Sequence, residues 1–207
     1  MSPLVLQLLL HTAQLLTHFF LIFVRNYLYK KNILKFSHLA CKVISVGNIS
    51  LGGTGKTPTV IFLAKLLQKQ SKVAILSRGY GKKTKGTQLV TDGKSKNVDW
   101  KLIGDEPALM STKLNGIPIV VDENRVRGGK FIIDNFNPDV IILDDAFQHR
   151  WIKRDLDILV IDQRFLIEDD FFSHNLLPTG IMRESLRSIN RAYVVIINRK
   201  FIEKKEI

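Results

Sequence analysis

The feature that most constrains the fold of this chain is a glycine-rich loop between a short apolar segment and a helical pattern. Residues 43–46 have the character of a short strand, residues 47–55 form the loop, and residues 57–70 repeat apolar side chains at helical spacing. The pattern G-x-x-x-x-G-K-[ST] is matched, with Ser in place of the first Gly, by Ser50-Leu51-Gly52-Gly53-Thr54-Gly55-Lys56-Thr57. Strand, loop and helix in this order predict a phosphate-binding P-loop.

A loop of this kind binds the phosphates of a nucleotide. Its glycines allow backbone N–H groups to turn toward the phosphates, and the start of the following helix adds the positive end of its dipole. We expect Lys56 to neutralise the β- and γ-phosphates and Thr57 to offer its hydroxyl to Mg²⁺. The sequence therefore predicts nucleotide binding at residues 50–57.

A second predicted strand carries the acidic residues that a P-loop requires. Residues 140–143 are continuously apolar, as in a parallel strand buried on both faces, and Asp144 and Asp145 follow directly. The carboxyl ends of parallel strands lie at one edge of the sheet. We therefore expect at least one of these carboxylates to join the Mg²⁺ site.

Apolar segments of strand length alternate with helical stretches along the rest of the chain. Strands are expected at residues 72–76, 117–121, 156–161 and 193–197, and helices at residues 107–114 and 124–136. This order predicts an α/β fold of the P-loop NTPase type, with a mostly parallel sheet flanked by helices.

Residues 1–35 combine an apolar helical pattern with a basic flank. Residues 4–24 are mainly apolar, and their polar side chains share one helix face: Gln7, His11, Gln14 and His18. The basic residues that follow have no acidic residue among them: Arg25, Lys30, Lys31, Lys35 and Lys42. We expect an amphipathic helix at an anionic membrane surface, with the rest of the chain on the cytoplasmic side. The alternative is a soluble helix that covers the domain.

The charge balance favours an anionic partner, because 31 Lys and Arg against 19 Asp and Glu give a net charge of +12. The basic residues between Lys65 and Lys101 have only Tyr80 and Trp100 as interleaved aromatics, which argues against a single-strand nucleic-acid groove. A membrane surface or a phosphorylated substrate remains. The single cysteine, Cys41, excludes an internal disulfide and a zinc site built on cysteines, and it is typical of a reducing, cytoplasmic environment.

A GTPase is not favoured. The acidic pair is followed by Ala146-Phe147-Gln148 and not by the glycine of a D-x-x-G switch. The segment Asn198-Arg199-Lys200-Phe201 lacks the order Asn-Lys-x-Asp that recognises guanine.

Six ordered motifs extend the pattern beyond the loop. They are Val46-Gly47-Asn48 running into the loop and Pro58, Leu76-Ser77-Arg78-Gly79-Tyr80-Gly81, Gly104-Asp105-Glu106-Pro107-Ala108-Leu109-Met110, Asp144-Asp145-Ala146-Phe147-Gln148-His149, Arg154-Asp155-Leu156-Asp157-Ile158 and Leu177-Pro178-Thr179-Gly180-Ile181-Met182-Arg183-Glu184. Together they resemble the tetraacyldisaccharide 4'-kinase family of lipid A biosynthesis, over nearly the whole chain. Ala146 stands where that family usually has Gly.

The resemblance implies a membrane-associated lipid kinase. Members of the family transfer the γ-phosphate of ATP to the 4'-hydroxyl of tetraacyldisaccharide 1-phosphate and so form lipid IVA. This implies ATP and Mg²⁺ as cofactors, an acylated glucosamine disaccharide phosphate as substrate, and the cytoplasmic face of the bacterial inner membrane as location. We expect neither nucleic acid nor an obligate protein partner.

The resemblance also implies roles for individual residues. Asp105 takes the position of the catalytic base, with Glu106 and Lys56 as further catalytic residues, although the spacing to Pro107 alone favours helix capping for the two acids. The implied Mg²⁺ ligands are Thr57, Asp144, Asp145 and Gln148. The residues expected to bind substrate or nucleotide phosphates are Asn48, Arg78, Tyr80, Arg125, His149 and Arg183.

Members of the family are longer and carry a second α/β lobe. We therefore expect a membrane-associating segment at residues 1–35, a kinase lobe at residues 36–190 and an incomplete second lobe from residue 191 to residue 207. A fragment of a full enzyme is favoured over a genuine short protein. The alternative function is that of a non-catalytic, membrane-associated nucleotide-binding module.

Overall fold

The computed structural model describes residues 36–95, 99–167, 175–177 and 180–199, together with residues 24, 27, 28 and 31. The chain divides into two units, Met1–Phe36 and Ser37–Ile207. Apart from Val24, the amphipathic helix expected at residues 4–24 lies outside the described residues. Within the described part of the chain, no helix has the length and apolar character needed to cross a membrane.

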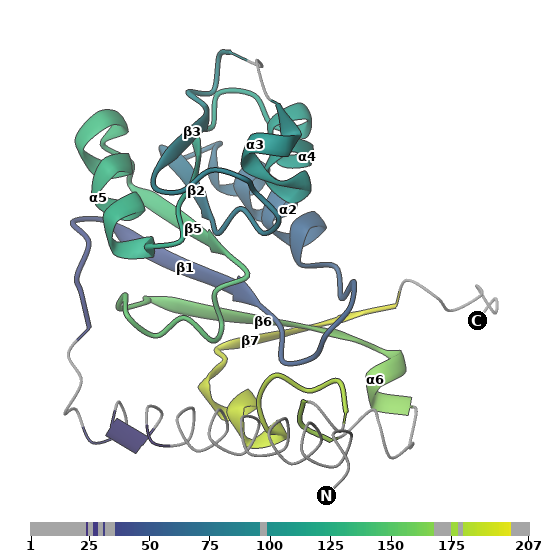
Figure 1. Cartoon of the computed structure of the whole chain (residues 1–207). Helices are drawn as coiled ribbons and strands as arrows, with labels where there is room; N and C mark the ends of the chain where they lie inside the picture. Colours follow the sequence, from purple (N-terminus) through teal and green to yellow (C-terminus); the bar gives the residue numbers. More distant parts are fainter. Residues whose placement is uncertain are drawn as a thin grey trace, which may run out of the picture. The chain divides into compact units, whose positions relative to one another are not determined.

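The second unit is built on one sheet (Figure 1). Its strand order is β3-β4-β2-β5-β1-β6-β7, and only the pair of β3 and β4 is antiparallel. The strands are β1 (Lys42–Gly47), β2 (Val73–Ser77), β3 (Gln88–Thr91), β4 (Ile119–Val121), β5 (Val140–Asp144), β6 (Leu156–Asp162) and β7 (Val194–Asn198). The glycine-rich loop follows β1, and the acidic pair lies at the end of β5. Because β1 and β5 are neighbours, the loop and the acids lie side by side, as the sequence predicts.

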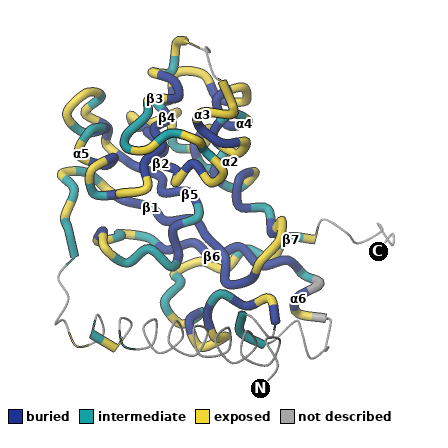
Figure 2. Tube along the Cα trace, in the orientation of Figure 1, coloured by how far each residue is buried: buried dark blue, intermediate teal, exposed yellow. Residues whose placement is uncertain are grey.

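Helices cover both faces of this sheet (Figure 1). On one face, α2 (Lys56–Leu67) and α4 (Asp105–Lys113) contribute Val60 and Met110 to a core with Ile142 of β5. On the other face, Ile132 of α5 (Arg125–Phe136) packs in a core with Ile141 of β5. Successive side chains of β5 therefore point into two different cores, which explains the continuous apolar sequence of this strand. Figure 2 shows these central strands as the buried part of the unit.

The helix boundaries follow local capping chemistry. The side chain of Asn124 accepts hydrogen bonds from the backbone N–H groups of Val126 and Arg127, which begins α5. Asn137 ends α5 in the left-handed conformation, with φ of 42°. Helix α4 begins at Asp105, two residues before the expected start, so Pro107 lies inside its first turn. A proline is tolerated there because the first N–H groups of a helix have no acceptor within the helix.

Some elements were not expected from the sequence: β3, α3 (Trp100–Ile103), α6 (Arg164–Ile167) and the 3₁₀ helix η1 (Leu186–Arg191). They are short or irregular, and β3 pairs with β4 through a bulge. A second lobe was expected to start at residue 191. In the structure, β7 continues the main sheet through parallel pairing with β6, from Val194 opposite Ile158 to Asn198 opposite Asp162.

Candidate active site

The glycine-rich loop has an open backbone at its centre. Gly52 and Gly55 have φ of 103° and 95°, a region that glycine adopts without steric penalty. A Cβ atom added to Gly52 or Gly53 would meet nothing within 4 Å, so this stretch of backbone faces open space. The loop leads directly into α2, where Lys56 and Thr57 are each only 8% exposed. The geometry fits a bound phosphate chain at the start of a helix.

Asn48 holds the loop from inside. Its side chain is fully buried, and its amide Nδ2 donates to the Ser50 carbonyl at 2.7 Å and to the Thr54 hydroxyl at 3.1 Å. The carbonyl of Asn48 accepts a hydrogen bond from Nε2 of Gln148 at 2.7 Å. Asn48 was expected to bind substrate, whereas the structure uses its amide to shape the loop. The hydrogen bond to the Asn48 carbonyl places Gln148 beside the loop.

The two acids at the end of β5 are held differently. Asp144 is fully buried, and its Oδ2 accepts a hydrogen bond from the Ser77 hydroxyl at 2.9 Å. Within the described part of the chain, its Oδ1 has no hydrogen-bond partner. Burial raises the pKa of Asp144 to about 6, and the nearby carboxylates of Glu106 and Asp145 act in the same direction. A buried carboxylate with a free oxygen is suited to a cation.

Asp145 contacts the cationic side chains of Lys56 and Arg183. It adopts φ of 47°, and its side chain lies 3.6 Å from Nζ of Lys56. Nη1 of Arg183 donates to both of its carboxylate oxygens, at 3.0 and 2.9 Å. The P-loop lysine, the acid that follows β5 and an arginine far along the chain therefore form one cluster at the carboxyl edge of the sheet.

Arg183 reaches this cluster because its segment pairs with the glycine-rich loop. The backbone N–H of Leu51 donates to the Ile181 carbonyl, and the N–H of Arg183 donates to the Ile49 carbonyl, both at 2.7 Å. Ser50 also forms an antiparallel bridge with Met182. The segment thus extends the loop like a short strand, which fixes where the guanidinium lies.

Asp105 and Glu106 form the exposed first turn of α4. The preceding Gly104 packs against the loop after β2, where an added Cβ would lie 2.6 Å from the Tyr80 carbonyl. Glu106 is near enough to Asp144 to raise the pKa of that carboxyl group. The structure therefore places both acids at the carboxyl edge, with their side chains accessible and the positive end of a helix dipole beneath them.

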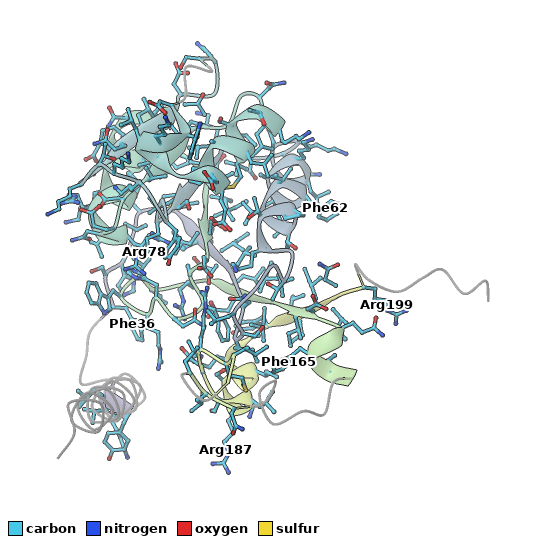
Figure 3. All side chains as sticks on the ribbon, turned by 45° about the vertical axis from the view of Figure 1, so that its right-hand side comes forward. Phe36, Phe62, Arg78, Phe165, Arg187 and Arg199 are labelled. Atoms are coloured by element: carbon cyan, nitrogen blue, oxygen red, sulfur yellow. The ribbon has the colours of Figure 1, made fainter. Side chains whose placement is uncertain are left out.

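The remaining residues expected to bind phosphates differ in exposure. Arg78, labelled in Figure 3, and Tyr80 are both exposed on the loop after β2. His149 is half-buried, with its ring centre 5.5 Å from that of Trp151. Its backbone carbonyl accepts a hydrogen bond from Nη1 of Arg154 at 2.5 Å.

Arg125 does not match the expectation of a phosphate-binding side chain. It is 2% exposed, and its Nη1 and Nη2 donate to the backbone carbonyls of Asp122 and Asp144, at 3.0 and 2.9 Å. Burial lowers the pKa of Arg125 to about 10, and the Asp144 carboxylate opposes this effect. The contacts indicate that Arg125 supports the backbone at the ends of β4 and β5.

Two residues near the loop were missed by the sequence reasoning. Ser77 donates to Asp144, and Nδ2 of Asn198 donates to the Thr54 carbonyl at 3.0 Å. Both stand at the carboxyl end of an apolar strand, which is the one signal that could have found them. In the sequence, Asn198 begins a segment that lacks the residue order of a guanine-recognition motif.

The donor set fits a nucleotide-bound Mg²⁺. Among the residues that the structure describes, no three His, Cys, Asp or Glu side chains gather into a metal site of their own. Mg²⁺ in kinases instead takes one or two carboxylates, phosphate oxygens and waters. Asp144, with its unpartnered Oδ1, and Asp145, beside the loop, meet that need.

Comparison with known proteins identifies the family. The family model described as tetraacyldisaccharide-1-P 4'-kinase matches residues 6–207. Two curated relatives are tetraacyldisaccharide 4'-kinases from Aquifex aeolicus, 44% identical over 182 residues, and from Halothermothrix orenii, 41% identical over 181 residues. The matches cover 88% and 86% of this chain but 56% and 46% of the relatives, so the chain spans about half of their length.

A solved structure shows the same fold. It is an "apo" form of LpxK from Aquifex aeolicus in complex with ATP, with a TM-score of 0.82 and 41% sequence identity. The match covers 96% of this chain and 62% of that one. The family model and the curated relatives show that the chain belongs to the tetraacyldisaccharide 4'-kinase family.

Proposed function

We propose that this protein transfers the γ-phosphate of ATP to the 4'-hydroxyl of tetraacyldisaccharide 1-phosphate, forming lipid IVA. The observation that carries the proposal is the cluster of Lys56, Asp145 and Arg183 beside an open glycine-rich loop. Membership of the family and the ATP in the solved relative support the same reaction.

The cluster is suited to binding a triphosphate. The amides of the loop and Nζ of Lys56 bind the β- and γ-phosphates, and the guanidinium of Arg183 adds a second positive group. Both cations contact Asp145, so they are already oriented before ATP arrives. Asp144, Asp145, Thr57 and Gln148 are the residues that would hold Mg²⁺, which neutralises negative charge on the phosphates when bound.

Asp105 is the proposed general base. A phosphoryl transfer to an alcohol needs a group that accepts the hydroxyl proton while the acceptor is held in line with the phosphate. Asp105 is exposed at the start of α4, and no described residue forms a hydrogen bond with its carboxylate. It is therefore available to the 4'-hydroxyl. Glu106 follows this base in the chain, and its carboxylate is close enough to Asp144 to raise the pKa of that buried acid.

The acceptor places the reaction at a membrane. Its acyl chains lie in a bilayer, and its phosphate lies at the bilayer surface. The apolar segment and basic flank of residues 1–35 are suited to an anionic membrane surface, at the cytoplasmic face of the inner membrane. Arg78 and Tyr80, both exposed on the loop after β2, are proposed to contact the lipid phosphate.

Transfer of radiolabelled γ-phosphate to the disaccharide monophosphate in detergent micelles tests this function. Lys56→Ala and Asp105→Asn should each reduce turnover by about a hundredfold or more, because each removes a group that acts on the reacting atoms. The matched controls are Lys65→Ala on the exposed side of α2 and Asp134→Asn on the exposed side of α5. Turnover that survives either catalytic substitution would refute the assigned roles, and ATP binding without transfer would favour a non-catalytic module.

Membrane attachment is tested separately by sedimentation with vesicles that contain anionic lipid. The protein should sediment with the vesicles, and removal of residues 1–24 should leave it in the supernatant. Unchanged sedimentation of the shortened protein would contradict the proposed anchor.

A further inference from the structure

Asn198, the last residue of β7, contacts the glycine-rich loop from the side. Its Nδ2 donates to the Thr54 carbonyl at 3.0 Å, across 144 positions of sequence. The same nitrogen packs so closely on Gly55 that a Cβ atom at that position would collide with it. The backbone of Asn198 is itself fixed, because its carbonyl accepts a hydrogen bond from the Gln163 N–H at 2.9 Å. The amide is therefore a rigid neighbour of the loop.

This contact fixes the orientation of one peptide group in the loop. The peptide that joins Thr54 to Gly55 is planar, so its C=O and N–H groups point in opposite directions. When Asn198 holds the carbonyl of Thr54, the N–H of Gly55 must point away from β7. Residue 55 is also the N-cap of α2, whose first N–H groups have no partner within the helix. The orientation of this peptide decides which donors are offered to an anion.

Two asparagines hold Thr54 from different strands. Asn48, just after β1, donates to the Thr54 hydroxyl at 3.1 Å, and Asn198 donates to its carbonyl. An amide is a donor without charge, so it can orient the backbone without competing with Lys56 for phosphate. Arg199, labelled in Figure 3, is exposed and forms no part of this contact.

We propose that Asn198 is a positioning residue that sets the Thr54–Gly55 peptide for the phosphate chain of the nucleotide. The inference rests on the proposed function, because it requires a nucleotide at the loop. Loss of one such hydrogen bond should weaken the binding of ATP and of ADP by about five- to tenfold. The affinity for adenosine should not change, because adenosine has no phosphate for the loop to bind.

Isothermal titration of the protein with ATP, ADP and adenosine tests the inference, with adenosine measured by competition. Asn198→Ala removes the donor, and Asn198→Asp replaces it by an acceptor of the same size, so the aspartate variant should lose more affinity. The control is Asn135→Ala, on the exposed side of α5, whose amide donates to the Phe131 carbonyl and to no other residue that the structure describes. Thermal melting checks that each variant is folded. If Asn198→Ala does not fold, the nucleotide affinities of Asn198→Asp test the inference instead.

The possible outcomes distinguish the positioning role of Asn198 from the proposed kinase function. Weaker binding of ATP and ADP with unchanged adenosine binding supports the positioning role. Unchanged nucleotide affinity in both variants, or an equal loss for adenosine, overturns that role while leaving the proposed kinase intact. A wild-type protein that does not bind ATP at all overturns both.

Discussion

Aspartates stand at both edges of the parallel sheet, and Asp144 at the carboxyl edge is held differently from Asp139 and Asp155 at the amino edge. At the amino edge, Oδ2 of Asp139 accepts the N–H of Lys72 at 2.7 Å, and Oδ2 of Asp155 accepts the N–H of Val43 at 2.8 Å. At the carboxyl edge, Asp144 is fully buried with an oxygen that has no partner among the described residues. Asp139 and Asp155 thus complete the backbone hydrogen bonding at the amino edge, whereas Asp144 keeps one oxygen without a partner in the described part of the chain.

The pKa values of Asp155 and Asp144 are shifted in opposite directions. The backbone N–H of Val43 lowers the pKa of Asp155, which means that the folded state favours its charged form. Burial raises the pKa of Asp144 to about 6, which means that the folded state disfavours its charged form. A protein keeps such an unfavourable group where chemistry requires it. Asp155 therefore contributes stability at the amino edge, whereas Asp144 gives up stability at the carboxyl edge.

A hollow of about 490 Å³ lies at the amino edge, lined by residues that include His38, Cys41 and Lys153. Burial raises the pKa of the Cys41 thiol, which disfavours its thiolate form. The charges and the open loop that suit phosphoryl transfer lie at the opposite edge. The arrangement of charges is therefore a better guide to the site than volume.

The largest expected effect comes from Asp145. Asp145→Asn removes the charge that orients Lys56 and Arg183, so phosphate transfer should fall by about a hundred- to a thousandfold, with little change in melting temperature. Turnover numbers and thermal melting of the purified variant check this. If Asp139→Asn at the amino edge lost as much turnover while folded, the contrast between the edges would be wrong.

Asp144→Asn should stabilise the protein that has no nucleotide bound, although it removes a proposed Mg²⁺ ligand. Because the pKa of Asp144 is raised from 3.8 to about 6, the penalty for its charge grows as the pH rises through that interval. The gain at neutral pH is at most roughly 3 kcal/mol, from about two pKa units, and should vanish near pH 3.8. Denaturant unfolding at several pH values measures it, and a variant that is less stable at neutral pH contradicts this account.

Asp155→Ala should destabilise the protein, in contrast to Asp144→Asn. It leaves the N–H of Val43 without its acceptor, so the free energy of unfolding should fall by about 1 to 2 kcal/mol. The pKa of Asp155 is lowered, so this stabilisation is present above the ordinary value of 3.8 and is lost as the pH falls below it. Turnover per folded molecule should be unchanged. A loss of turnover without a loss of stability would show that the amino edge takes part in the chemistry.

The smallest effect is expected for Lys42, the exposed partner of Asp155. Its Nζ lies 3.4 Å from Oδ1 of Asp155, and its side chain is 75% exposed. Lys42→Ala should change the free energy of unfolding by less than about 0.5 kcal/mol, because water screens such a pair. A larger loss in denaturant titrations would mean that the ion pair, and not the hydrogen bond to Val43, gives the amino edge its stability.

Much of this arrangement could be predicted from the sequence. The continuous apolar run of β5 and the loop pattern before α2 are local signals, and both elements form where expected. The placement of Asp144 and Asp145 beside the loop follows from parallel pairing of β1 with β5. Asp105 and Glu106 were expected at a helix start, and α4 begins with them.

Contacts between distant segments could not be predicted. An arginine at the start of a helix has the same sequence signature whether it is exposed or buried, and only the structure shows that Arg125 binds backbone carbonyls. Asn48 belongs to a recognisable motif, yet its hydrogen bonds depend on how the loop folds back. Asn198 meets Thr54 only because β7 joins the sheet two strands away from β1.

Backbone hydrogen exchange of the wild-type protein, with and without ATP and Mg²⁺, is the most direct test of the contrast between the two edges. Nucleotide binding should slow exchange in residues 48–57 and 181–184 and leave exchange in residues 38–42 and 153–155 unchanged. Slower exchange confined to the amino edge, or a glycine-rich loop whose exchange does not respond to nucleotide, would contradict this expectation.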